Sequence, residues 1–243
     1  METNNLNFIQ ANQSEIDTSA MSRTFMASVF SWMFAALAIT AVVSYYFASN
    51  TQLISLLVNV EVGGLTTLGY VVMFAPIGFV LAMSLGFNKF SYPVILLLFL
   101  LYSAVMGASL SFIFLMYTAA SIYGTFAAAA GMFGLMAVVG YTTKTDLTKF
   151  GSIMMMGLVG IIIASVINFF LKSDSMSYII SFIGVLVFTG LTAYDVQKLK
   201  RIGAGAEFGT ASTSKLVIMG ALNLYLDFIN LFLFLLRLFG DRK

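Results

Sequence analysis

Seven long apolar stretches, separated by short polar segments, dominate the sequence and restrict the folds open to it. Each is close to the length of about 20 residues that an α-helix needs to cross a hydrocarbon core of about 30 Å. Membrane strands would be shorter and would alternate polar with apolar residues, so the pattern predicts helices. The stretches cover approximately Phe25–Ala48, Leu68–Phe87, Pro93–Tyr117, Ile122–Tyr141, Ser152–Leu171, Tyr178–Val196 and Leu216–Phe239.

Charged residues are too scarce for a chain that folds in water. They make up 9% of the 243 residues, while 60% are hydrophobic, whereas soluble domains carry about 25% charged residues. We therefore predict an all-α integral membrane protein with seven transmembrane helices in a lipid bilayer. Its expected parts are a polar cytoplasmic tail over residues 1–21, one seven-helix domain over residues 22–240 and a C-terminal tail over residues 241–243.

Several function classes are excluded by composition. The chain has no cysteine and no histidine, which removes disulfides, thiol catalysis, the usual zinc sites and histidine acid–base chemistry. Its net charge of +2 is too small to indicate a nucleic-acid partner, and no phosphate-binding loop or dinucleotide fingerprint is present. We expect no enzymatic activity and no cofactor. Any pH sensing must use carboxylates.

The basic residues predict the orientation of the helices. With a cytoplasmic N-terminus, eight of the twelve bases lie inside and four outside, three of these in the C-terminal tail. Cytoplasmic loops carry an excess of Lys and Arg, so this orientation is favoured. A re-entrant seventh stretch would move the tail inside, but we expect seven full crossings and a multi-pass protein of the cell inner membrane.

Two aspartates lie in otherwise apolar sequence, where a charge costs about 2.5–3.5 kcal/mol or more. Asp195 lies near the cytoplasmic end of the sixth stretch and can pair with Lys198, one turn along the helix. Asp227 has about eight uncharged residues on either side. Its side chain either makes structural hydrogen bonds to neighbouring helices or belongs to an ion or proton site.

Asparagines accompany Asp227 on one helical face. Asn223 and Asn230 lie four residues before it and three after it, and an oxygen-rich face suits a hard cation such as calcium. Two carboxyls that meet cannot both ionise cheaply, so Asp195 and Asp227 would share a proton and titrate as a unit. Their spacing leaves that contact open. It requires the seventh helix to start in the cytoplasm, or the loop 203–214 to dip inward.

Four segments resemble the Bax inhibitor-1 family, also called the transmembrane Bax inhibitor motif family. They are TAYDVQKLK, LYLDFINLFLFLLR, LLYSAVMGASLSFIFLMYT and GYTTKTDLTKFGSIMMMGLVGIIIASVINFF. The resemblance runs from about Arg23 to Arg237. It implies a seventh helix surrounded by the other six, a pH-sensitive calcium leak as in prokaryotic relatives, and contact between Asp195 and Asp227, which match the paired aspartates of the family.

One departure from the family concerns gating. Leak-forming relatives use an arginine near the cytoplasmic end of the second helix as a latch on the aspartate pair. Here that region reads FVLAMSLGFNKFSYP, with Lys89 as its nearest base. Lysine pairs with a carboxylate as a point charge rather than as a bidentate fork. Lys89 is therefore the candidate latch, but the gating scheme of the family does not transfer directly.

Three functions compete at this point. The first is a calcium-permeable, pH-gated leak or a calcium–proton exchanger, with Asp195 and Asp227 as the ion site. The second is a non-transporting stress regulator that binds a membrane protease or another membrane protein through residues 1–21. The third, an intramembrane aspartyl protease, is disfavoured, because Leu224-Tyr225-Leu226 precedes Asp227 where that class has a GxGD motif, and no PAL tripeptide follows.

Overall fold

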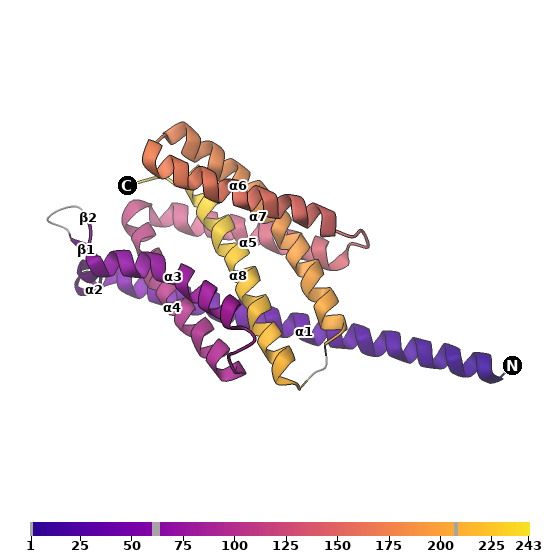
Figure 1. The fold of residues 1–243 in the computed structure, drawn as a ribbon. Coiled ribbons are helices and arrows are strands. Elements are labelled where there is room, and N and C mark those ends of the chain that lie inside the picture. Colours follow the sequence, from indigo (N-terminus) through magenta and orange to yellow (C-terminus); the bar gives the residue numbers. More distant parts are fainter. Residues whose placement is uncertain (1, 60–63, 207–208) are drawn as a thin grey trace.

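Helices form almost all of the part of the chain that the structure describes (Figure 1). This computed structural model covers residues 2–59, 64–206 and 209–243, with side chains described from residue 20 onward. The elements are α1 (Glu2–Ser49), α2 (Thr51–Leu57), β1 (Val58–Asn59), β2 (Gly64–Leu65), α3 (Thr67–Gly86), α4 (Tyr92–Met116), α5 (Ala119–Thr142), α6 (Thr148–Leu171), α7 (Asp174–Ala204) and α8 (Ala211–Phe239). Seven of these helices, all except α2, are long and apolar enough to span a membrane. The prediction of an all-α integral membrane protein is confirmed.

Three features of the chain differ from the predicted elements. Helix α1 already begins at Glu2, so its backbone is helical through the segment predicted as a polar tail. Helix α7 continues to Ala204, beyond the predicted end at Val196. The residues after Val196 are too polar for the hydrocarbon core, but they still favour a helix, so α7 continues beyond its apolar part. Between the first two spans the chain forms α2 and a small antiparallel hairpin that pairs Val58 with Leu65. Hydropathy detects neither, since both lie outside the apolar stretches.

Hydroxyl side chains cap the N-termini of several of the spans. Thr66 accepts a hydrogen bond from the backbone N–H of Gly69, Thr118 accepts one from Ser121, and Ser173 accepts one from Met176. Each satisfies an N–H group that has no partner within the first helical turn. Such caps allow very short connections, and only Tyr117 and Thr118 separate α4 from α5.

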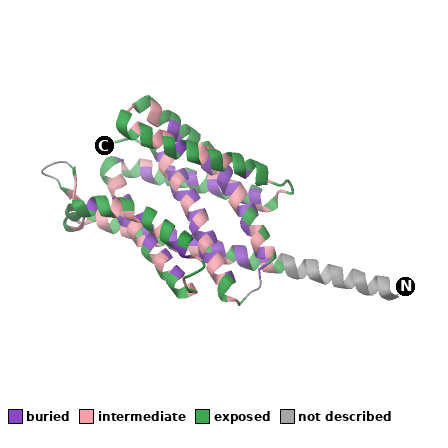
Figure 2. Ribbon diagram, in the orientation of Figure 1, coloured by how far each residue is buried: buried purple, intermediate pink, exposed green. Residues whose placement is uncertain are grey.

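Helix α8 lies at the centre of the bundle. In the most apolar 18-residue stretch of α8, 67% of residues are buried, compared with 6% in the corresponding stretch of α6. Figure 2 shows the same contrast along the ribbons. Helices α1, α4, α5 and α7 pack directly against α8, while α3 packs mainly on α4 and α6 mainly on α7. The predicted central seventh crossing is confirmed, with α3 and α6 as outer helices.

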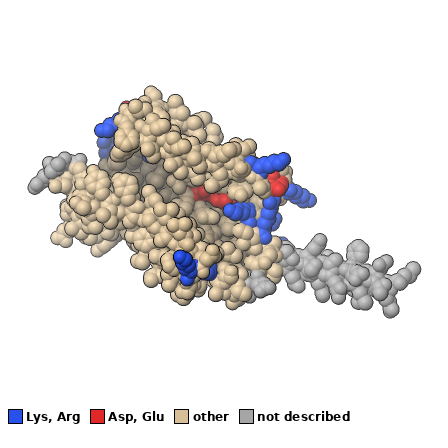
Figure 3. Space-filling model, in the orientation of Figure 1, with Lys and Arg blue, Asp and Glu red and all other residues tan. Residues whose placement is uncertain are grey.

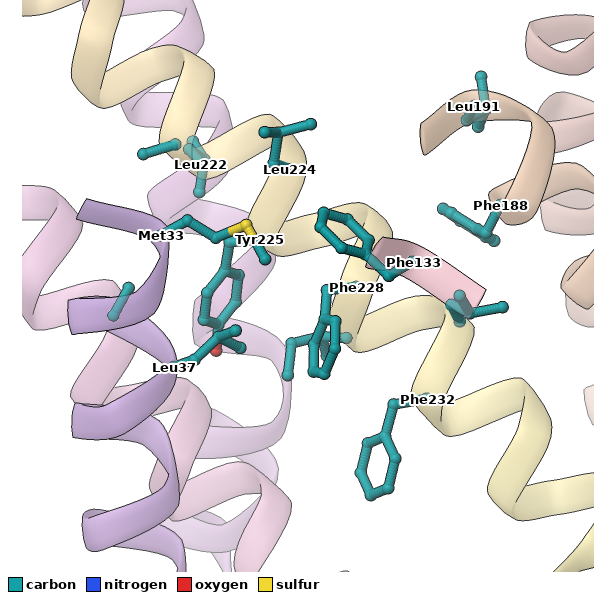
Figure 4. Close-up of a cluster of buried hydrophobic side chains, with 14 of the residues drawn as sticks. Met33, Leu37, Phe133, Phe188, Leu191, Leu222, Leu224, Tyr225, Phe228 and Phe232 are labelled. Carbon is teal, nitrogen blue, oxygen red and sulfur yellow. The ribbon is translucent and has the colours of Figure 1, made fainter. Parts of the chain in front are cut away.

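Aromatic and aliphatic side chains hold α8 in place (Figure 4). Phe228 of α8 makes edge-to-face contacts with Phe126 and Phe133 of α5, with ring centroids 5.2 and 5.6 Å apart. Met33 and Leu37 of α1 belong to the same buried cluster on another side of α8. Edge-to-face aromatic pairs add to the energy of area burial, so the contacts of α8 are specific rather than merely apolar.

The outward faces of the outer helices are apolar as well. Leu85 of α3 is 80% exposed, and Phe169 and Phe170 of α6 are 75% and 77% exposed. Large apolar side chains exposed to this extent along whole helices are unfavourable in water and suit contact with lipid tails. The surface thus agrees with the membrane assignment made from hydropathy.

The two ends of the bundle differ in charge (Figure 3). Lys200 donates to the carbonyl of Tyr141 near the end of α5, and Lys215 donates to the carbonyl of Phe87 just after α3. We call this end, which also carries Lys89 and Lys144 in the adjoining turns, the basic end. Ser22 lies there too, since its hydroxyl donates to the carbonyl of Lys200 at 3.0 Å. The C-terminal residues lie at the opposite end, where the N–H of Thr118 donates to the carbonyl of Asp241 at 3.1 Å. The seventh stretch is therefore a full crossing. Of the predicted tail, residues 1–21, the structure describes side chains only for Ala20 and Met21.

Candidate ion site

The structure brings Asp195 and Asp227 together at the interface of α7 and α8. Both residues line one cavity, and they are close enough to interact electrostatically. Asp227 is only 5% exposed, and Asp195 is partly buried. The two aspartates that the resemblance pairs are therefore neighbours, and a proton shared between them stays a prediction.

A direct bond between the two carboxyls would require a proton. Oδ2 of Asp227 is buried and has no hydrogen-bond partner among the described residues. Two ionised carboxylates have only acceptors, so they cannot hydrogen-bond to each other. A proton that joined them would belong to the pair rather than to either residue. We call Asp195 and Asp227 the dyad from here on.

The dyad lies in a cavity of about 750 Å³ that α3 and α6 flank on opposite sides. Ile77 and Val80 contribute to the α3 wall, and Met155 and Leu158 contribute to the α6 wall. Figure 3 shows acidic atoms in a cleft between walls of uncharged residues, beside basic atoms at one end. The two outer helices thus leave a hollow over the most polar part of the central helix.

The predicted asparagines share this cavity. Asn223 and Asn230 line it together with Asp227, and both are partly buried. The amide nitrogen of Asn230 donates to the carbonyl of Leu226, one turn back in α8, at 2.8 Å. That bond directs the amide nitrogen to the helix backbone and leaves the amide oxygen as an acceptor. The predicted oxygen-bearing face of α8 therefore faces the dyad cavity.

Lys198, rather than Lys89, is the base beside the dyad. Lys198 lines the cavity and interacts electrostatically with Asp195. Lys89 is exposed in the turn between α3 and α4 and is not among the residues that line the cavity. This conformation therefore gives no support to Lys89 as the latch. The pairing of Asp195 with Lys198, the first alternative weighed from sequence, coexists with the dyad instead of replacing it.

A tyrosine that sequence reasoning passed over also belongs to the site. Tyr102 of α4 is fully buried and lines the dyad cavity, and its hydroxyl has no hydrogen-bond partner among the described residues. Buried hydroxyls usually have partners. The available signal was its position, because tyrosine prefers the membrane interface and Tyr102 falls near the middle of α4.

Gln197 fixes the loop beneath the dyad. Its side-chain oxygen accepts from the N–H of Leu147 and from Arg201, both at 2.9 Å, and its amide donates to the carbonyl of Thr145 at 2.8 Å. Arg201 also pairs with the exposed Asp146 at 2.8 Å. Hydrogen bonds from Thr148 and then from Arg201 hold the pKa of Asp146 well below its usual range. The α5–α6 loop is thus fastened to α7 two residues after Asp195.

Gln197→Leu should release this loop. The substitution preserves the approximate shape but removes three hydrogen bonds, each worth about 1 kcal/mol net, and water compensates in part at this end of the bundle. We expect a loss of about 2 kcal/mol and faster hydrogen–deuterium exchange over residues 143–147. Gln197→Glu retains both acceptor contacts and should lose less than half as much. Equal exchange in both variants and the parent protein would contradict the role assigned to Gln197.

Known proteins resemble this chain over nearly its whole length. Residues 22–243 match the family described as inhibitor of apoptosis-promoting Bax1. Inner membrane protein YbhL of Escherichia coli strain K12 is 47% identical over 222 residues, which cover 91% of this chain and 93% of YbhL. A protein of Borreliella burgdorferi is 44% identical over 220 residues, covering 90% and 92%. A protein of Rickettsia prowazekii is 42% identical over 224 residues, covering 91% of each.

Proposed function

Since this chain belongs to the Bax inhibitor-1 family, we propose that it is a pH-sensitive, calcium-permeable leak channel or calcium–proton exchanger in which the dyad carries the conducted ion. The observation that supports this proposal most directly is that both carboxyls line one cavity of the membrane-spanning bundle. Ionisable groups at membrane depth are expensive, and in transport proteins they mark ion and proton pathways.

The chemistry of the cavity suits a hard cation. Calcium binds to carboxylate, amide and hydroxyl or water oxygens, and the cavity offers the dyad together with Asn223 and Asn230. Within the described residues no group of three acidic, histidine or cysteine side chains gathers at one point. Two carboxyls without a third acid favour weak binding, which conduction requires, over a resident structural ion. Calcium is thus proposed as cargo, and neither a cofactor nor an enzymatic role is proposed.

The shared proton links calcium to pH. A cation that binds both carboxylates must displace any proton that the dyad shares, because a protonated oxygen is a poor ligand. Protons and calcium therefore compete for the same oxygens. This competition makes ion occupancy depend on pH without any histidine, and it is compatible with either a leak or an exchanger.

The proposed location is the bacterial inner membrane with a cytoplasmic N-terminus. The similarity to YbhL and the seven apolar helices support a multi-pass inner membrane protein. The basic end carries Lys89, Lys144, Lys200 and Lys215, and Ser22 contacts α7 there. Excess basic charge marks the cytoplasmic side, so the basic end and the start of the first span are placed inside.

Calcium flux into proteoliposomes tests the proposal. We expect the parent protein to conduct calcium at a rate that changes with pH across neutrality. Asp195→Asn and Asp227→Asn should each reduce the flux at least tenfold and flatten its pH dependence, because the amide cannot exchange a proton. Asp174→Asn, at the opposite end of α7, is the matched control and should leave the flux unchanged. Flux that survives unaltered in both dyad variants would overturn the proposal.

A further inference from the structure

A second cavity lies on the opposite face of the central helix. It has a volume of about 550 Å³ and is bounded by α1, α4, α5 and α8. Its α8 wall consists of Ile229 and Phe232, whereas the dyad cavity meets α8 at Asn223, Asp227 and Asn230. At 100° per residue these two sets project in nearly opposite directions. The second cavity also lies nearer the C-terminal end of the bundle, since it reaches Tyr46 of α1 and Ile122 of α5.

Each cavity holds a buried hydroxyl that has no hydrogen-bond partner among the residues that the structure describes. In the dyad cavity this is Tyr102, and in the second cavity it is Ser44, which is only 4% exposed. Unpartnered buried hydroxyls are uncommon in proteins, and those that exist usually indicate a place that water or an ion occupies at some stage. Two such groups on opposite sides of one helix therefore point to two sites that share an occupant.

A thin partition separates the cavities. Tyr102 meets Tyr225 of α8 edge to face, with ring centroids 5.3 Å apart. The Tyr225 hydroxyl lies 2.8 Å from the hydroxyl of Thr40, which lines the second cavity. Because Thr40 donates its own proton to the carbonyl of Ser103 at 2.9 Å, Tyr225 is the donor in the first bond. Figure 4 shows Tyr225 projecting from α8 towards α1, close to Leu37.

We propose that the two cavities are successive halves of one route for water and small cations, closed in this conformation by the Tyr225–Thr40 hydrogen bond. The identity of the ion rests on the proposed function. The route enters at the basic end, passes the dyad and Tyr102, crosses between α4 and α8 at Tyr225, and continues towards Ser44. The walls of the second cavity are almost entirely apolar, so this half stays dry while the partition is closed, as in a hydrophobic gate.

Rotation of the Tyr225 side chain is the movement that opens the partition. It breaks one neutral hydrogen bond and leaves the backbone of α8 in place. The hydroxyls of Thr40, Ser44 and Tyr102 then become the polar groups that replace part of the hydration shell of a passing ion. The partition is therefore a side-chain gate that is distinct from the dyad.

A cysteine at position 44 reports whether the route exists. The chain has no native cysteine, so Ser44→Cys carries a single thiol. We use a charged, membrane-impermeant methanethiosulfonate reagent on the full chain in vesicles of both orientations. Reaction from the basic end should be slow with Tyr225 present and at least tenfold faster after Tyr225→Ala. Thr40→Val, which deletes the hydroxyl but keeps the shape, should accelerate the reaction about threefold and serves if Tyr225→Ala does not fold.

Ser181→Cys is the matched control. Ser181 is fully buried in α7 and lines neither cavity, so its thiol should stay unreactive in every background. Equal Ser44→Cys rates with and without the gate substitutions, or parallel acceleration of Ser181→Cys, would overturn the route. Calcium flux is measured separately. Accessibility without flux supports the route and counts against calcium conduction, whereas dyad-dependent flux without accessibility does the reverse.

Discussion

Gly140→Val should lower the thermal unfolding temperature of the detergent-solubilised protein by roughly 10 °C. A Cβ atom at Gly140 would fall on the backbone carbonyl of Ala193 in α7, two residues before Asp195. Backbone cannot move aside as a flexible side chain can, so the cost lies at the upper end of the overpacking range, about 3 kcal/mol. For a chain of this size each kcal/mol shifts the unfolding temperature by about 2–4 °C. Close approach through small residues is how helices pack in lipid.

A second glycine on the same helix separates packing from helix propensity. Gly134 is exposed, and a Cβ there would meet nothing within 4 Å. Gly134→Ala should therefore leave the unfolding temperature unchanged or raise it slightly, since alanine favours the helix by up to about 1 kcal/mol. Thermal scans followed by size-exclusion chromatography measure both variants. Similar unfolding temperatures for Gly140→Val and Gly134→Ala would show that the α5–α7 crossing tolerates separation.

Hydropathy predicted the crossings well because the bilayer imposes one length on every span. The spans α3, α4 and α5 begin and end within about three residues of the predicted stretches. The errors concern polar sequence. Helix α7 extends eight residues past Val196, and the hairpin of β1 and β2 lies between spans. Neither feature buries apolar surface in lipid, so a pattern based on apolar runs contains no information about it.

The dyad shows where reasoning from spacing stops. The sequence gives the number of residues between each aspartate and the polar end of its apolar stretch. This number predicted that Asp227 lies deeper in the membrane than Asp195. The structure puts Asp195 nine residues before the end of α7 and Asp227 sixteen residues after the start of α8. Both residues nevertheless line one cavity, because helix tilt and crossing angle also determine relative height, and packing sets both. Family resemblance supplied the pairing of the two aspartates as an expectation, while Tyr102, Tyr225 and Thr40 required the structure itself.

Asp227→Leu should stabilise the fold while abolishing calcium flux. Leucine has a similar volume and removes a buried oxygen that has no hydrogen-bond partner among the described residues. Replacing a whole buried polar or ionic pair by apolar residues often raises stability by about 1–4 kcal/mol. Here only Asp227 is replaced, but Asp195 keeps Lys198 as its electrostatic partner and loses a like-charged neighbour, so the same sign is expected. At the lower half of that range the unfolding temperature should rise by roughly 5 °C. Proteins commonly retain such unfavourable groups at functional sites, where stability is exchanged for activity.

The same substitution distinguishes an ion site from a structural hydrogen bond, the alternative that the sequence left open for Asp227. A structural carboxyl would make Asp227→Leu destabilising, because Asp195 on α7 would lose its neighbour on α8 and the contact between the two helices would weaken. Asn230→Leu provides the comparison. The amide of Asn230 bonds only within α8 among the described contacts, so this change should alter stability little and reduce flux only partially. A lower unfolding temperature for Asp227→Leu than for Asn230→Leu would therefore assign the dyad to architecture, whereas higher stability with lost flux is the behaviour of a group kept for the ion it carries.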